Sequence, residues 1–307
     1  MIREVKLGEI LEYEQPSMYI VKNTNYDKTF DTPVLTAGQT FILGYTNEKE
    51  NIFKAKENPV IIFDDFTTAS KYVDFDFKVK SSAMKILKAR EGINIKYIYY
   101  AMKNIKFDNQ LHKRYWISEY SKIKLLLPDI KMQEKIVKEL DLVIKVLDYK
   151  KKQIKLFDEL IKSQFVEMFE LEKYELEMLG GISNFIDYRG KTPTISDDKE
   201  VRIVNAKSVG KGFFKYIDEY ITEDLYEKWM KRGIAYAGDV LFVTEGHTFG
   251  NTCLIPNGIE RFALGQRVIT IQGKEKLNNI YLCYYMQLDE FINKINIYKT
   301  GGTAKGI

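Results

Sequence analysis

The chain contains residue types that carry catalysis in other proteins, but their spacing matches no familiar reaction. Gly190, Lys191 and Thr192 resemble the end of a phosphate-binding loop. Such a loop also requires a glycine five residues before Gly190, and this chain has Phe185 there. A nucleotide-binding loop is therefore disfavoured. No Gly-x-Gly-x-x-Gly motif lies between a predicted strand and a predicted helix, so a dinucleotide site is unsupported as well.

Metal binding and nucleophilic catalysis are also poorly supported. The histidines, His112 and His247, and the cysteines, Cys253 and Cys283, have a spacing that fits no zinc module. No serine stands in a Gly-x-Ser-x-Gly elbow. The adjacent carboxylates at positions 64–65 can bind a metal in principle, but a turn at the end of a strand explains them better. The sequence predicts no catalytic residue, no metal and no cofactor in this chain.

Composition sets the broad class of the protein. A length of 307 residues with 45% hydrophobic content is enough for two folded domains. The net charge of +4 permits nucleic-acid binding without requiring it. The early charges of the first ten residues do not fit a signal peptide, and no apolar run reaches the roughly 20 residues of a membrane helix. With no disulfide framework, we expect a cytoplasmic protein without a membrane partner.

Polar loops that carry glycine, basic or aromatic residues are the most informative feature. Glycine lets a backbone approach a phosphate closely, and Lys, Arg, Ser and Thr donate hydrogen bonds to it. Arg, Gln and Asn can read base edges in the major groove. One such loop is unremarkable, but their recurrence in both halves of the chain favours contact with duplex DNA. The predicted DNA-binding residues are Lys71, Lys113, Arg114, Tyr188, Arg189, Lys191, Thr192, Lys207, Lys211, Thr244, His247, Thr248, Asn251, Gln266, Arg267, Lys299, Thr303 and Lys305.

A long helix is predicted between these two groups of loops, from about Asp129, a candidate N-cap, to Met168. The segment lacks Pro and Gly, and at about 1.5 Å per residue about 36 residues of it span roughly 54 Å. Its apolar residues repeat every seven positions, which is typical of a coiled-coil seam. The alternative, a core helix of one domain, is disfavoured by the lysines at 150–152. The predicted seam residues are Leu140, Leu147, Ile154, Ile161 and Met168.

The two halves resemble each other in sequence order. The segment 93–102 (INIKYIYYAM) matches 277–286 (LNNIYLCYYM) at an offset of 184, and other short segments recur in the same order. Two copies of one domain fold are therefore predicted. In the first copy we expect a strand, turn and strand within 33–43, a buried strand at 59–63, a half-buried strand over 72–79 and a helix over 95–102.

These features together resemble the specificity subunit of type I restriction–modification systems. The residues that carry the resemblance are KLGEI (6–10), IKLLLPDIKMQEKIV (123–137), YRGKTP (188–193), GDVLFVTEGHTFG (238–250) and TGGTAKGI (300–307). In that family, two target-recognition domains each read one half of a split DNA site. Long helices form an antiparallel coiled coil that spaces the domains and docks two methyltransferase subunits.

The resemblance implies an α+β fold in which two similar mixed α/β target-recognition domains are joined by a long helix of the coiled-coil type. The expected divisions are 1–128, 129–170 and 171–307. The expected partners are double-stranded DNA, methyltransferase subunits, a restriction/translocase subunit and possible second copies of the chain. S-adenosylmethionine, ATP and Mg²⁺ would belong to partner subunits. The family's second conserved helix, after the second recognition domain, is not found in this sequence, which puts the normal geometry in doubt.

Other functions stay open at this stage. The chain can be a coiled-coil adaptor whose flanking domains bind protein, or a half-sized subunit that acts as a homodimer. A nuclease or methyltransferase complete in itself is disfavoured by the missing motifs. Steep weakening of duplex binding with salt distinguishes a DNA-recognition protein from an adaptor.

Overall fold

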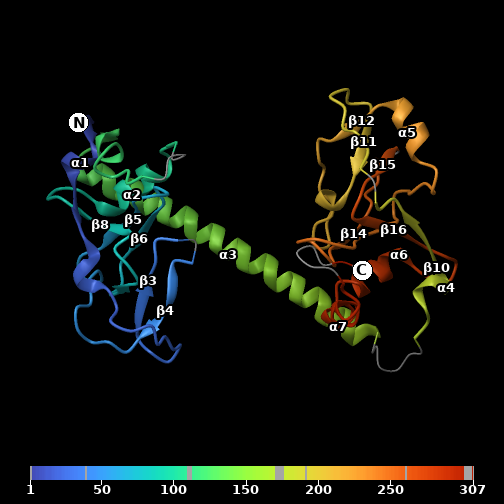
Figure 1. Cartoon of the computed structure of the whole chain (residues 1–307), viewed down its shortest axis with the longest axis horizontal. Helices are drawn as coiled ribbons and strands as arrows, with labels where there is room; N and C mark the ends of the chain where they lie inside the picture. Colours follow the sequence, from blue (N-terminus) through green and yellow to red (C-terminus); the bar gives the residue numbers. More distant parts are fainter. Residues whose placement is uncertain are drawn as a thin grey trace. The chain divides into compact units, whose positions relative to one another are not determined.

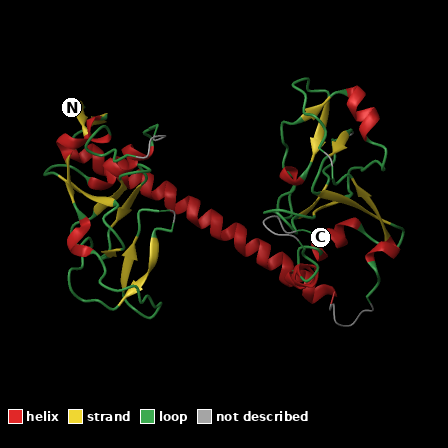
Figure 2. Ribbon diagram, in the orientation of Figure 1, coloured by secondary structure: helices red, strands yellow, loops and turns green. Residues whose placement is uncertain are grey.

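The chain forms two compact units, Met1–Lys150 (unit 1) and Lys151–Ile307 (unit 2), and the division falls inside one long helix, α3 (Ile130–Phe169). The structure is a computed structural model that describes residues 2–38, 40–108, 113–169, 176–190, 192–259, 261–300 and 306. Each unit combines small sheets with short helices (Figures 1 and 2). The predicted α+β fold with a long connecting helix is confirmed.

Unit 1 is built around a four-stranded antiparallel sheet in the order β2-β8-β5-β6. A three-stranded sheet, β4-β3-β7, has one parallel pair, β3 with β7, and β1 pairs with β9. The elements are β1 (Arg3–Lys6), α1 (Leu7–Ile10), β2 (Leu11–Glu14), η1 (Pro16–Tyr19), β3 (Thr32–Leu35), β4 (Ile42–Thr46), β5 (Val60–Asp64), β6 (Ser70–Val73), β7 (Lys78–Val79), β8 (Met84–Ala89), α2 (Ile95–Lys103), η2 (Tyr120–Lys122) and β9 (Lys124–Leu127).

Unit 2 repeats this plan. Its four-stranded sheet has the order β10-β16-β13-β14, and its three-stranded sheet, β12-β11-β15, again has one parallel pair, β11 with β15. The elements are α4 (Leu179–Ile182), β10 (Ser183–Asp187), β11 (Val201–Val204), η4 (Ala206–Ser208), β12 (Tyr220–Ile221), α5 (Glu223–Trp229), β13 (Val240–Val243), β14 (Thr252–Leu254), β15 (Phe262–Leu264), β16 (Val268–Gly273), α6 (Asn279–Tyr285) and α7 (Asp289–Asn296).

The matching strand orders confirm the predicted repeat, and the Tyr-rich helices show its local cause. Helix α2 begins after Asn94, whose side chain accepts hydrogen bonds from the backbone N–H groups of Lys96 and Tyr97. Helix α6 begins after Asn278, which caps the N–H groups of Ile280 and Tyr281 in the same way. Asparagine is a favoured N-cap because its oxygen satisfies backbone donors that have no partner inside the helix. The offset of 184 therefore aligns the same capping residue in both units.

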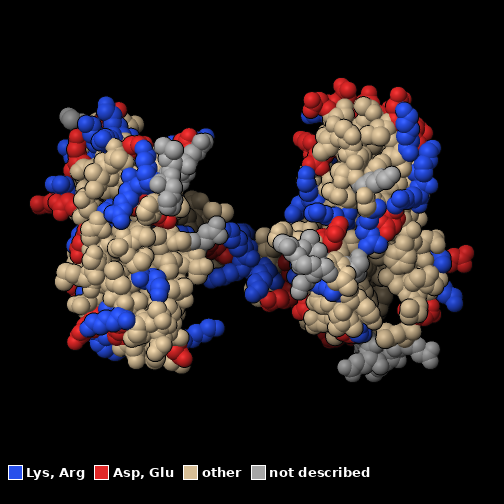
Figure 3. Space-filling model, in the orientation of Figure 1, with Lys and Arg blue, Asp and Glu red and all other residues tan. Residues whose placement is uncertain are grey.

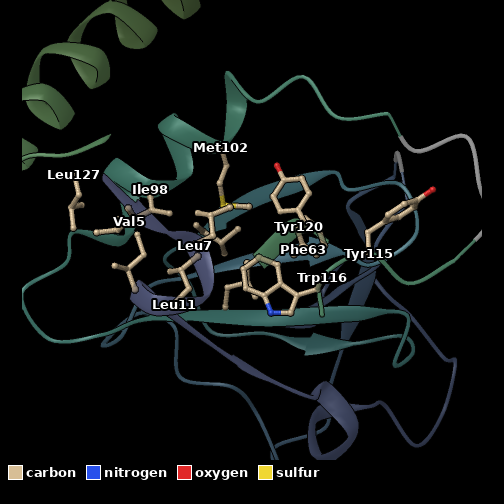
Figure 4. Packing of buried hydrophobic residues seen from close by; sticks show 13 residues of the cluster. Val5, Leu7, Leu11, Phe63, Ile98, Met102, Tyr115, Trp116, Tyr120 and Leu127 are labelled. Atoms are coloured by element: carbon tan, nitrogen blue, oxygen red, sulfur yellow. The ribbon is translucent and has the colours of Figure 1, made fainter. Parts of the chain in front are cut away.

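Large buried side chains fill the space between α2 and the four-stranded sheet of unit 1. Figure 4 shows Ile98 and Met102 pointing from α2 into a cluster that contains Phe63, Trp116 and Tyr120. The rings of Phe63 and Trp116 meet edge to face with centroids 5.2 Å apart. Aromatic rings in this arrangement gain stability beyond the burial of their area. The high aromatic content thus serves the core of unit 1, not only its surface.

The first part of α3 is held by side chains of unit 1. Asp129 caps the helix by accepting a hydrogen bond from the N–H of Met132 at 3.1 Å, as predicted, and this bond lowers the pKa of its carboxyl. Buried Gln133 accepts from the N–H of Asn94 at 2.9 Å and donates to the carbonyl of Pro128 at 2.8 Å. Lys96 also forms an ion pair with Asp141 at 2.7 Å.

One predicted element is wrong. The alternating segment 72–79 is not one strand, because β6 ends at Val73 in the four-stranded sheet and β7 begins at Lys78 in the three-stranded sheet. Between them Phe77 is fully buried and pairs through its backbone with Phe53, with an N–H to carbonyl distance of 2.9 Å from Phe53 to Phe77. The chain leaves one sheet for the other here, which period-two alternation cannot reveal.

Among the residues described, no helix is both long enough and apolar enough to cross a membrane.

The equivalent caps give a test of the fold. Replacement Asn278→Ala removes the acceptor for two backbone N–H groups, so we expect the free energy of unfolding of unit 2 to fall by about 1 kcal/mol. Urea unfolding followed by circular dichroism measures this loss. The control Asn278→Asp keeps an acceptor oxygen and should retain most of the stability. Equal losses in both variants would contradict the capping role.

Candidate nucleic-acid interface

Several predicted loops of unit 2 meet where its strands end. The N–H of Thr244, just after β13, donates to the carbonyl of Arg267, just before β16, at 3.1 Å. Glu245, next to Thr244, pairs through its backbone with Gly306 and forms an ion pair with Arg267 at 3.5 Å. Gly306 also pairs with Thr300. Segments that lie far apart in sequence therefore form one polar loop cluster.

A second loop joins this cluster through the β13–β14 connection. The side chain of Asn251 donates to the carbonyl of Val209 at 3.3 Å, and the N–H of Gly212 donates to the carbonyl of Thr252 at 2.9 Å. These bonds hold the exposed Lys211 beside the 244–251 loop. The predicted loops around positions 207–212 and 244–251 are thus neighbours.

Lys299 lies at the same place, with its ammonium 3.9 Å from the centre of the Phe249 ring. A cation held over an aromatic face is attracted by the negative face of the ring. Phe249 was not predicted as a site residue. The residues around Phe249 in the sequence do not indicate that its ring contacts Lys299, which lies 50 positions later in the chain.

Arg189 follows β10 and is bound to Asp187, whose Oδ2 accepts from Nε at 2.8 Å. This pairing raises the pKa of Arg189, to which the charge of Glu245 also contributes. The pKa of Asp187 is lowered: burial alone would raise it, but the Arg189 hydrogen bonds and charge outweigh burial. Arg232, which was not predicted, donates to the carbonyl of Asp187 at 3.2 Å and adds a third charge.

Lys207 is partly neutralised by its own unit. It forms an ion pair with Glu219, which also accepts a hydrogen bond from the Asn205 side chain at 2.9 Å. The hydrogen bond from Lys207 is the main cause that lowers the pKa of Glu219. Because Lys207 is mostly exposed, it can still face an external phosphate while Glu219 orients it.

Two predicted contact residues are corrected by the structure. Tyr188 is 3% exposed, stacks on Trp229 and donates its hydroxyl hydrogen to the carbonyl of Gly233 at 2.9 Å. Thr244 is 1% exposed, and no partner for its hydroxyl is found among the described residues. Both side chains belong to the interior, so neither is available to DNA. Of the residues that follow them, Arg189 is exposed and Glu245 is half-buried.

The remaining predicted residues of unit 2 have varied positions. Thr192, His247 and Arg267 are exposed, whereas Thr248 and Gln266 are half-buried. Lys191, Thr303 and Lys305 lie outside the described residues.

Fewer of the predicted contact residues lie in unit 1. Lys71 is exposed on β6, and its charge, together with the larger effect of burial, lowers the pKa of Lys103. Lys113 forms an ion pair with Glu119 and lies 5.4 Å from the centre of the Tyr115 ring. Arg114 is exposed. Lys103, which was not predicted as a contact residue, ends α2 and donates to the carbonyl of Ser70 at 2.9 Å.

The paired carboxylates at 64–65 lie at the end of β5, where the chain turns, as expected. Asp64 accepts from the Thr67 hydroxyl at 2.6 Å, whereas Asp65 accepts from the N–H of Trp116 at 2.8 Å and forms an ion pair with buried Lys85 at 3.5 Å. No group of three or more metal-binding side chains occurs within the described ranges.

The cysteines have no reactive character. Both thiols are buried, and burial raises the pKa of Cys253 to about 12 and that of Cys283 to about 11. A thiol is nucleophilic only as the thiolate, so neither residue is suited to nucleophilic catalysis near pH 7.

The predicted seam of α3 is exposed along its length. The exposed fractions are 37% for Leu140, 53% for Leu147, 63% for Ile154, 48% for Ile161 and 72% for Met168. In contrast, Phe165 is buried and its ring lies 5.2 Å from that of Tyr281 on α6. This end of α3 therefore packs on α6 through Phe165, while the neighbouring seam residues Ile161 and Met168, one turn before and after it, stay exposed.

Basic side chains are visible across the middle of unit 2 in Figure 3, and acidic ones gather at its end near β12 and α5. The loop cluster therefore combines exposed cations, hydrogen-bond donors and glycine-rich backbone. This combination suits contact with a polyanion such as a nucleic-acid backbone.

Comparison with known proteins identifies the family. No protein-family model matches the chain. The specificity subunit of the type I restriction enzyme EcoR124I/EcoR124II from Escherichia coli is 39% identical over 241 residues, which are 71% of this chain and 58% of that protein. The chain belongs to the family of type I restriction enzyme specificity subunits.

One solved structure supports the fold of this family member. The S subunit of a type I restriction–modification system from M. genitalium has a TM-score of 0.56 at 12% identity, covering 97% of this chain and 80% of that chain. A chain from another solved type I system has a TM-score of 0.46 at 13% identity, covering 95% of this chain and 79% of that one. The present chain spans about 58% of the length of the Escherichia coli relative.

The Glu219 pair gives a pH-dependent test of the site. Because the folded pKa of Glu219 is lowered, its ionised form stabilises unit 2 above the unfolded pKa, and this contribution disappears as pH falls through the folded pKa. Replacement Glu219→Gln should cost up to about 1 kcal/mol at pH 7 and little at pH 3. Urea unfolding at both pH values measures the difference. The exposed Glu275→Gln is the control, and a pH-independent cost for Glu219→Gln would refute the assignment.

Proposed function

We propose that this chain is a DNA-recognition subunit in which unit 1 and unit 2 each read one part of a bipartite duplex target. The observation that carries the proposal is the repeat: two units with the same strand order follow one another in a chain of the specificity-subunit family. Two copies of one fold with different loops suit the reading of two different half-sites. The name of the Escherichia coli relative, a specificity subunit, supports the same role.

The loop cluster of unit 2 supports duplex DNA as the ligand. Exposed Lys211, half-exposed Arg189 and Lys299 over Phe249 supply positive charge at the place where backbone N–H groups and polar side chains gather. Charges of this kind attract phosphates without regard to sequence, and a few side chains then select bases. In unit 1, Lys71, Lys113 and Arg114 would play the corresponding part.

Helix α3 would serve as the spacer and as a docking surface for methyltransferase subunits. Its 40 residues correspond to about 60 Å. Its exposed apolar seam needs a partner, because an apolar stripe of this length is rarely left in water. A second copy of this chain is the other occupant that the exposed seam favours, and it would make the active species a homodimer.

Catalysis would belong to other subunits. We expect the chain to recognise DNA while methyltransferase and restriction/translocase subunits bind S-adenosylmethionine, ATP and Mg²⁺ in the cytoplasm. The two buried thiols, whose pKa values are raised by burial, are compatible with this division of labour.

Selection from a random duplex pool tests the proposed function. The full chain, with and without its methyltransferase subunit, is incubated with the pool, and the bound fraction is sequenced. A split motif with a fixed gap is expected. A single half-motif or its palindrome would show that the chain acts as a half-subunit or homodimer. No enrichment with the partner present would overturn DNA recognition and favour an adaptor.

Salt dependence tests the electrostatic part of the interface. The double variant Arg189→Ala with Lys211→Ala should weaken binding to all duplexes alike. It should also reduce the slope of log affinity against log salt concentration by about 2, or roughly one for each lost phosphate contact. Fluorescence anisotropy at several salt concentrations measures the slope. Lys228→Ala, in the last turn of α5, is the matched control. If Lys228→Ala reduced the salt slope as much as the double variant does, Arg189 and Lys211 would not be part of the interface.

A further inference from the structure

Arg267 has a backbone conformation that is costly for an arginine. Its φ angle is +64°, in the left-handed region that side chains other than glycine rarely adopt. Such a conformation costs on the order of 1 kcal/mol or more and persists only where the surroundings enforce it. Here the hydrogen bond from the N–H of Thr244 to the carbonyl of Arg267 helps to hold the turn. Strained residues of this kind concentrate at functional sites.

The side chain of Arg267 is held at its base and open at its tip. Its Nε lies 3.5 Å from Oε1 of Glu245, and both side chains remain partly exposed, at 49% and 39%. Gly246, with a φ of +86°, leaves room beside it, since a Cβ added there would lie 4.0 Å from one terminal nitrogen of Arg267. Among the described residues, no partner is found for either terminal nitrogen.

The other arginines of unit 2 use their terminal nitrogens within the protein. Arg189 binds Asp187 through Nε at 2.8 Å and a terminal nitrogen at 2.7 Å. Arg261 pairs with Glu223 and Glu227 through its two terminal nitrogens. Arg202 binds the carbonyl of Ile217 and the hydroxyl of Tyr220. Arg232 donates to two backbone carbonyls. Arg267 differs from these residues because its fork of two donors stays open.

The position of Arg267 is also one at which the two units differ. One pair of strand residues in each unit aligns the two sheets. In unit 1 Ile61 pairs with Leu87, and Ile61 packs in the cluster beneath α2. In unit 2 Val240 pairs with Ile271, and Val240 packs in the same way beneath α6. Leu87 is therefore equivalent to Ile271. The residue four positions before Leu87 is Ala83, and the residue four positions before Ile271 is Arg267, so Ala83 is the unit 1 equivalent of Arg267. The scaffold is the same, but only unit 2 presents a charged fork here. Such a position suits a residue that distinguishes one half-site from the other.

We propose that Arg267 reads a guanine in the half-site bound by unit 2, and that Glu245 is the positioning residue that aims its guanidinium. The two terminal N–H groups match the O6 and N7 acceptors of guanine in the major groove, which no other base offers as a pair. The inference rests on the proposed function, because it assigns a base-reading role within the same loop cluster.

The experiment compares the motifs selected from a random duplex pool by the full chain and its variants, each with its methyltransferase subunit. Arg267→Lys keeps the charge but loses the planar fork. We expect it to lower the preference for G·C at one position of one half-site by roughly 10- to 100-fold, while the rest of the motif and the affinity for non-cognate duplex stay the same.

Glu245→Gln and a matched control complete the design. Glu245→Gln should weaken the preference at the same position and leave the other positions unchanged, which a general loss of stability would not do. Arg261→Lys alters another half-exposed, ion-paired arginine of unit 2 and should leave the whole motif intact. An unchanged motif for Arg267→Lys would overturn the base-reading role alone. The absence of any motif for the unaltered chain would overturn the proposed function with it.

Discussion

The double role of the Tyr-rich helices, α2 and α6, is the constraint on which each unit depends. One face of α2 buries Ile98 and Met102 against the sheet, and the other face holds α3 through Lys96 and Tyr100, which both bind Asp141. Burial and the hydrogen bond that its hydroxyl donates to Asp141 raise the pKa of Tyr100. In unit 2 the corresponding helix binds α3 through aromatic packing of Tyr281 on Phe165.

This arrangement places rigid and variable parts at different points of each unit. The strand order, the asparagine caps and the helix that packs on α3 are the same in both units, whereas the loops after β5 and β13 differ in length and sequence. A scaffold fixed by buried contacts tolerates loop changes, because loops contribute few buried contacts of their own. The same physical separation lets one fold present two different recognition surfaces.

Some cations of unit 2 are partly neutralised by acidic side chains of the same unit. Lys207 and Arg189 each have an acidic partner within the unit, which fixes their direction and reduces the net charge. Pairing of this kind favours directed contacts over simple attraction, since an oriented guanidinium loses less conformational freedom when it binds. Arg267 also has an acidic partner, Glu245, but no partner for its two terminal nitrogens is found within the described part of unit 2.

Much of the architecture follows from the sequence itself. The segment that matches at an offset of 184, the Asn94 and Asn278 caps and the uninterrupted helix after Asp129 depend on local preferences and on repetition, which are readable from residue order. The tertiary structure decided the rest. It buried Tyr188 and Thr244, divided 72–79 between two sheets and brought Glu245, Arg267 and Lys299 into one cluster. These outcomes depend on contacts between residues far apart in the chain, and local sequence carries no record of which distant partner a side chain meets.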